Sequence, residues 1–122
     1  MADEQDYETR ITEEGGILRF VPRGKLEFGR SERFLTLVRN TARARGCRRV
    51  LIDARAFSDP MPNNDRFAIG ERVAEEWRGL RVAVVSPVEA RDGFIETVAV
   101  NRGATARGFE SVERAMDWLS LE

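Results

Sequence analysis

The hydrophobic pattern begins with two short segments on either side of a pair of glycines. Polar and apolar residues alternate over 7–12, which is the period of a half-exposed strand, and 17–21 is mainly apolar. Gly15 and Gly16 between them accept the positive φ that a tight turn needs. The pattern therefore predicts an N-terminal antiparallel hairpin whose first strand lies at a sheet edge and whose second strand is stopped by Pro22-Arg23-Gly24.

The next stretch predicts one helix, one buried strand and one loop. Apolar residues recur at helical spacing between Ser31, a predicted N-cap, and Gly46, a predicted C-cap. Val50-Leu51-Ile52 is a continuous apolar run, as expected for a central strand covered on both faces. Residues 58–64 combine two prolines with polar residues that favour turns, so they predict the longest loop.

In the second half of the chain, helices and strands alternate. A helix is predicted from Pro62 or Asn63 to Trp77, ended by Gly79, and a strand follows over 80–86. A further helix is predicted between Pro87 and Gly103. An edge strand over 105–109 and a helix with apolar positions from Val112 to Leu119 complete the chain. Right-handed crossovers make such strands parallel. The expected fold is α/β: a mixed sheet of about five strands, with an N-terminal hairpin followed by β-α repeats, and about four helices mostly packed against one face.

Composition favours one folded domain. The chain has 122 residues, 42% hydrophobic and 34% charged, which is enough to bury a single core over 7–122, while the acidic stretch 1–6 is expected to be a disordered tail. Twenty basic and twenty-one acidic residues give a net charge of -1, so no overall field attracts nucleic acid or an anionic membrane. Because no apolar stretch follows the acidic start, we expect no signal peptide, no membrane insertion and a cytoplasmic location.

Several kinds of catalytic chemistry lack their usual residues. The sequence has no histidine, and Cys47 is its only cysteine, so an intrachain disulfide, cysteine-based zinc sites and histidine-activated nucleophiles are excluded. The scattered glycines form no phosphate-binding loop. We therefore expect no enzyme, no metal and no cofactor. Asp53, at the end of a predicted central strand, is expected to cap the next turn or to pair with Arg55, because the turn at Pro22-Arg23-Gly24-Lys25 lacks the acidic pair of a phosphoacceptor site.

One basic cluster lies where the first helix gives way to the strand that follows. It consists of Arg39, Arg43, Arg45, Arg48 and Arg49. Cations at this position complement the carbonyl end of the helix dipole. No aromatic residues alternate with these arginines, so a solvated helix end is favoured over a nucleic-acid surface.

The order and spacing of three segments resemble a known family. Val21-Pro22-Arg23-Gly24-Lys25-Leu26-Glu27 is similar to the glycine-leucine-acid turn after the second strand of STAS domains, Arg49-Val50-Leu51-Ile52-Asp53 is similar to their central strand, and 108–119 is similar to their closing strand and helix. The chain thus resembles the STAS domains typified by bacterial anti-sigma-factor antagonists, in particular their SpoIIAA-like branch grouped with SEC14-type domains. The resemblance implies a STAS-like fold and non-catalytic regulation through protein contacts.

The sequence departs from the family in the loop after the central strand. STAS antagonists carry an Asp-Ser-Ser-Gly or similar signature there, whose hydroxyl is phosphorylated by a partner kinase. This chain reads Asp59-Pro60-Met61-Pro62-Asn63-Asn64, with no hydroxyl at the expected position, and Ser58 lies a few residues early. The expectation is a protein-binding module without the usual phosphorylated serine. Its predicted partner surface is Ser58, Asp59, Met61, Asn63 and Asn64.

A second hypothesis is a carrier of a hydrophobic, lipid-like ligand. Met61, Phe67 and Ile69 from the second helix region, with Phe94 and Ile95 from the third, would line a groove between these helices. The SEC14 likeness points the same way. Against it, aromatic residues at helical spacing are usually core, which is the simpler interpretation of Phe67. A homodimer is compatible with either function.

Overall fold

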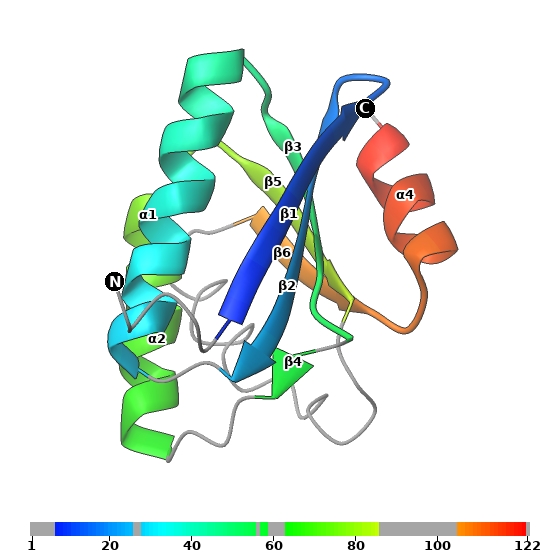
Figure 1. Ribbon diagram of the computed structural model, residues 1–122. Coiled ribbons are helices and arrows are strands. Elements are labelled where there is room, and N and C mark those ends of the chain that lie inside the picture. Colours follow the sequence, from blue (N-terminus) through cyan, green and yellow to red (C-terminus); the bar gives the residue numbers. More distant parts are fainter. Residues whose placement is uncertain (1–6, 26–27, 56, 59–62, 86–104, 122) are drawn as a thin grey trace.

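The computed structural model describes residues 7–25, 28–55, 57–58, 63–85 and 105–121 (Figure 1). The elements along the chain are β1 (Tyr7–Glu14), β2 (Ile17–Lys25), α1 (Phe28–Arg45), β3 (Arg49–Asp53), β4 (Phe57–Ser58), α2 (Asn63–Glu76), β5 (Arg81–Val85), β6 (Thr105–Phe109) and α4 (Val112–Ser120). Every one of these elements except the short β4 was predicted from the sequence. The helix predicted between Pro87 and Gly103 lies outside the described residues, as does the tail at 1–6.

The strands form one mixed sheet in the order β1-β2-β3-β5-β6. β1 pairs with β2 antiparallel, and the pairs β2–β3, β3–β5 and β5–β6 are parallel. The two-residue β4 lies off this path and pairs in parallel with the end of β2. The predicted mixed sheet with an N-terminal hairpin is confirmed, with β1 and β6 at its two edges.

Helices cover both faces of the sheet (Figure 1). α1 and α2 pack on one face, in a cluster that contains Leu18, Phe20, Phe34, Leu35, Val38, Ala42, Cys47, Val50, Ile52, Val73, Trp77 and Val82. α4 packs on the other, where Ala115 and Leu119 join Ile17, Leu51, Ala83 and Val85. Two of the three described helices therefore pack on one face, as the expectation of packing mostly on one face allows, and α4 covers the other. The reason is that β3 and β5 present apolar side chains alternately to both faces, and each face needs a cover.

The hairpin turn has the predicted chemistry, but β2 is longer than expected. Gly15 and Gly16 have φ values of 59° and 80°, the left-handed conformation of a two-residue hairpin turn. β2 continues through Pro22 to Lys25, so the prediction that Pro22 stops the strand is wrong. β3 is in register with β2 only as far as Phe20, and β4 joins only at Gly24. Pro22 thus lies where β2 has no parallel partner, and a residue without an N–H is accommodated there.

α1 begins earlier than predicted and ends where predicted. The helix starts at Phe28, so Ser31 lies inside its first turn and the N-cap assignment is wrong. Serine is favoured as an N-cap but is also accommodated within helices, so its presence alone does not locate a helix start. At the other end Gly46 has φ 64°, its N–H donates to the Arg43 carbonyl at 3.3 Å, and the Cys47 N–H donates to the Ala42 carbonyl at 3.0 Å. These are the two bonds of a glycine-capped helix end.

Candidate functional site

The carboxyl ends of β2, β3 and β4 lie at one edge of the sheet, where the predicted partner segment begins. β3 ends at Asp53, and β2 and β4 end side by side because Gly24 and Lys25 are in register with Phe57 and Ser58. α2 then begins at Asn63, as the sequence predicted. The segment between Ser58 and Asn63 therefore starts and ends on regular structure at the edge where ligands and partners of α/β sheets gather.

Asp53 is the one charged residue that the fold buries among those whose burial the structure describes, with 5% of its surface exposed. Its Oδ1 accepts from Arg55 Nε at 2.8 Å and its Oδ2 accepts from Arg55 Nη2 at 2.7 Å. The backbone N–H of Arg55 also donates to Oδ1, at 3.3 Å. The predicted role of Asp53, capping the next turn and pairing with Arg55, is confirmed.

A second arginine reaches the same carboxylate from the neighbouring strand. Arg19 Nη2 on β2 lies 3.3 Å from Asp53 Oδ2. The hydrogen bonds from the Arg55 side chain lower the pKa of Asp53 below its ordinary value against the opposing effect of burial, and the bond from Arg19 adds to this. In turn, the carboxylate raises the pKa of Arg55. Asp53 is therefore a charged structural anchor, poorly suited to accept or deliver protons near neutral pH.

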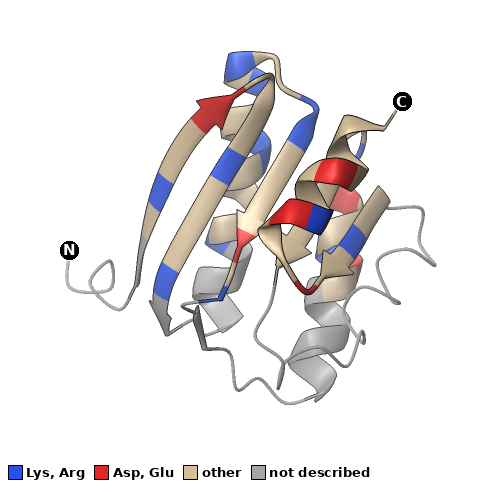
Figure 2. Ribbon diagram, turned by 90° about the vertical axis from the view of Figure 1, so that its right-hand side faces the viewer, with Lys and Arg blue, Asp and Glu red and all other residues tan. Residues whose placement is uncertain are grey.

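No local pattern in the sequence predicts the contact of Arg19 with Asp53. Arg19 shares a face of β2 with Val21 and Arg23, because its two neighbours, Leu18 and Phe20, point into the α1 and α2 cluster. Figure 2 shows that basic residues occur along both β1 and β2. Contact with Asp53 follows from the parallel pairing of β2 with β3, which puts Arg19 opposite Leu51, two residues from Asp53. Only the register of two distant strands reveals it.

The predicted site residues fall into two groups. Ser58 belongs to β4, Asn63 and Asn64 are the first two residues of α2, and Asp59 and Met61 lie outside the described residues. For the apolar groove, Phe67 and Ile69 belong to α2. Phe94 and Ile95, like Met61, lie outside the described residues, so the groove stays a prediction.

Two hollows lined by described residues lie at the opposite edge of the sheet, around Arg48 and Leu80. Within the described ranges, no three histidine, cysteine, aspartate or glutamate residues are placed to hold a metal ion. None of the helices in those ranges combines the length and the apolar character needed to cross a membrane.

Comparisons with known proteins give structural matches only. No protein-family model and no curated protein matches the sequence. An anti-sigma factor antagonist from Mycobacterium paratuberculosis is similar in structure, with a TM-score of 0.65 and 13% identity over 95% of this chain and 97% of that one. An uncharacterised protein with a SpoIIAA-like fold from Shewanella loihica PV-4 has a TM-score of 0.56 and 20% identity, with 93% of each chain covered. The chain therefore has the SpoIIAA-like α/β fold that its resemblance to STAS domains predicts.

Proposed function

We propose that this chain is a non-catalytic regulatory module that binds a protein partner through Ser58, Asp59, Met61, Asn63 and Asn64. The observation that carries the proposal is the pairing of β4 with the end of β2, which fixes Ser58 beside Lys25. Asn63, five residues later, already belongs to α2. Ser58 and Asn63 thus belong to regular structure, which reduces the conformational entropy that these two residues lose when a partner binds.

The chemistry of the neighbouring side chains supports binding rather than catalysis. Asp53, the buried acid at this edge, has both carboxylate oxygens engaged by Arg55, and Arg19 contacts one of them. A group held in this way is a poor base or nucleophile. The sequence contains no histidine that could activate a serine or the single cysteine. The fold itself is shared with a protein whose name, anti-sigma factor antagonist, describes action on another protein.

We propose further that partner binding is not controlled by phosphorylation at the position used by STAS antagonists. The segment from Asp59 to Asn64 contains no hydroxyl side chain. The nearest hydroxyl, that of Ser58, belongs to a residue paired in the β2–β4 ladder. Phosphate analysis of protein purified from its host is expected to find no phosphoserine at Ser58.

The test is a partner capture with a matched pair of variants. Asn63→Glu/Asn64→Glu adds bulk and charge to the proposed surface, and acidic residues are favourable in the first turn of a helix, so the fold should be kept. Asn40→Glu makes the same change at an exposed position on α1. A partner captured from the host is identified by mass spectrometry, purified and titrated against each variant. We expect the double variant to bind at least about tenfold more weakly and the Asn40 variant to bind as the wild type does.

Two results would contradict the proposal. Equal affinity of the double variant and the wild type would place the partner surface elsewhere. Native mass spectrometry that finds a hydrophobic molecule retained by the purified protein, together with no captured partner, would instead favour the lipid-carrier hypothesis. Circular dichroism of all variants establishes whether a lost interaction comes from the surface or from the fold.

A further inference from the structure

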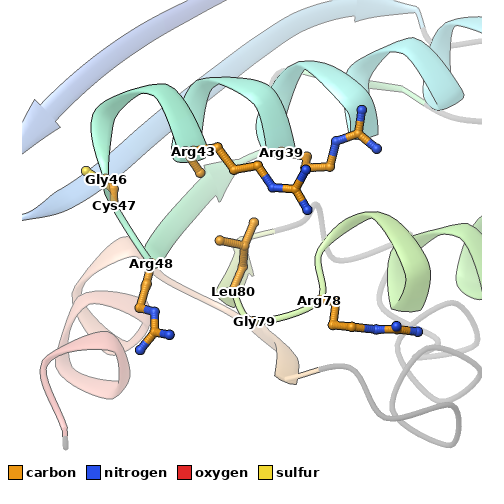
Figure 3. Close-up of a pocket in the computed structure, with 9 residues that line it drawn as sticks. Arg39, Arg43, Gly46, Cys47, Arg48, Arg78, Gly79 and Leu80 are labelled. Atoms are coloured by element: carbon orange, nitrogen blue, oxygen red, sulfur yellow. The ribbon is translucent and has the colours of Figure 1, made fainter.

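Two adjoining hollows lie at the amino ends of the parallel strands, the edge opposite the proposed partner segment, and Figure 3 shows the residues that line the first. Their volumes are about 320 and 340 Å³, and they share Arg48, Gly79 and Leu80. The first lies between the end of α1 and the turn that follows α2, and the second reaches the starts of β3, β5 and β6. We call the lining of both hollows the basic face.

The basic face is strongly positive in a chain that is almost neutral. Among the described residues that line the hollows there are six arginines and no aspartate or glutamate. The arginines are Arg39, Arg43, Arg48, Arg49, Arg78 and Arg81. Because the whole chain has a net charge of -1, this concentration of one sign is a local property of the fold. The sequence showed only part of it, since Arg78 and Arg81 come from a different turn.

Two of the six arginines make contacts that hold elements of the fold together. Arg39 forms an ion pair with Glu76, with Nη1 2.6 Å from Oε1, and so joins α1 to α2. Arg81 Nη2 donates to the Trp118 carbonyl at 3.0 Å, and its guanidinium lies 3.8 Å from the centre of the Trp118 ring. These contacts fix the rim of the basic face.

The other four arginines have no carboxylate partner within the described part of the chain. None of Arg43, Arg48, Arg49 and Arg78 forms an ion pair with another described residue. The Arg43, Arg48 and Arg78 side chains are exposed. Their guanidinium groups keep all their donors available, and each matches a carboxylate in two-point geometry.

The arrangement of these side chains favours an extended ligand. In Figure 3 the Arg43 side chain runs along α1 above Leu80, whereas the Arg48 and Arg78 side chains leave the two turns on opposite sides. Groups that spread in this way do not enclose one compact anion such as a free phosphate. They suit a chain that carries several negative charges. Leu80, partly buried and shared by both hollows, offers an apolar contact between them.

We propose that the basic face binds an acidic peptide segment of a partner protein. Its carboxylates pair with Arg43, Arg48 and Arg78, and an apolar side chain between them packs on Leu80. Nucleic acid fits less well, because the described residues that line the two hollows include no aromatic side chain for base stacking and the net charge opposes it. The basic face lies at the opposite edge from the partner segment of the proposed function, so each proposal can be tested independently of the other.

The experiment uses the full chain and fluorescence anisotropy. The probe is a short labelled peptide of glutamates around a central leucine, and the comparison ligands are the same peptide with glutamines and a labelled oligo(dT). The test variant is Arg43→Gln/Arg78→Gln, and the control is Arg114→Gln, an exposed arginine in the first turn of α4. We expect the acidic peptide to bind, to weaken as salt rises, and to lose about tenfold or more in affinity only with the double variant.

Each other outcome overturns the proposal. Failure of the acidic peptide to bind at low salt, or equal loss with Arg114→Gln, removes the basic face as a peptide site. Tighter binding of oligo(dT), lost in the double variant, assigns the same arginines to nucleic acid instead. Arg43→Lys/Arg78→Lys keeps the charge and guards against a folding defect, and it is expected to bind the peptide better than the glutamine variant does.

Discussion

Asp53 and Arg55 form a two-point ion pair across a single turn, with Arg55 Nε 2.8 Å from Oδ1 and Nη2 2.7 Å from Oδ2. Asp53 ends the central strand, and Arg55 begins the path toward β4. The pair therefore fixes the direction in which the chain leaves β3 and heads for the proposed partner segment. Arg19 contacts the same carboxylate from β2, so one buried acid ties two strands and a turn together.

Replacing Asp53 with asparagine is expected to destabilise the fold. The amide cannot accept charge-assisted bonds from both arginines, and its NH₂ group would face a guanidinium donor. We expect the free energy of unfolding to fall by about 1 to 3 kcal/mol in urea titrations at neutral pH. Asp117→Asn, at an exposed position on α4, is the control and should change it little. An equal loss in both variants would show that the pair with Arg55 is unimportant.

The same carboxylate should make stability depend on pH in the acid range. The pKa of Asp53 is lowered in the folded protein by the Arg55 hydrogen bonds first of all. A group with a depressed folded pKa contributes stability that is present above its unfolded pKa, about 4, and is lost as the pH falls through its folded pKa.

Urea titrations of the wild type and Asp53→Asn below about pH 5 measure this contribution. The difference in unfolding free energy between the two proteins is expected to shrink as the pH falls. A difference that stays constant down to the lowest pH at which the protein folds would mean that the ionised form of Asp53 has no special role.

Local sequence patterns predicted most elements of the fold because the responsible residues are close in the chain. Gly15-Gly16 set the hairpin, Gly46 ended α1, and the alternation in β1 marked an edge strand. The features that were not predicted depend on contacts between residues that are distant in the sequence. β4 is only two residues long and exists because β2 extends past Pro22 to meet it. The position of α4 on the second face follows from the burial of β3 and β5 on both sides.

The candidate sites show the same division. Asp53 and Arg55 are two residues apart, and their contact could be predicted from the sequence. Arg19 and Asp53 are 34 residues apart, and only the β2–β3 pairing brings them together. The basic face likewise combines Arg43 and Arg48, seen in the sequence as a helix end, with Arg78 from the turn after α2. Charge that gathers from separate turns has no sequence signature.

The hairpin turn offers a stability test that separates backbone conformation from packing. Gly16 has φ 80°, and a Cβ added there would meet no atom within 4 Å. Gly16→Ala is therefore expected to cost about 1 to 2 kcal/mol purely because an L-residue disfavours this conformation. Gly15→Asn is the matched variant and is expected to lose less stability than Gly16→Ala, because asparagine followed by glycine is the preferred pair in such turns. Thermal unfolding that shows equal losses for both variants would contradict this account.

Cys47 is expected to react slowly with thiol reagents for two reasons, its burial and the neighbouring carboxylate of Glu13. Its side chain is buried, and burial raises the pKa of the thiol, with the negative charge and hydrogen bond of Glu13 raising it further. Only the thiolate attacks a disulfide reagent, so the native protein should react at least about tenfold more slowly than the urea-unfolded chain.

Glu13→Gln removes the effect of the Glu13 carboxylate and leaves the effect of burial. The midpoint of the pH–rate profile is expected to move to lower pH in this variant, because the thiolate no longer lies beside a carboxylate. Glu14→Gln, the next residue along the same strand, is the control and should leave the midpoint unchanged. If the midpoint stays fixed in Glu13→Gln while the native rate remains slow, restricted access to the buried sulfur alone accounts for the protection, and the electrostatic contribution of Glu13 is refuted.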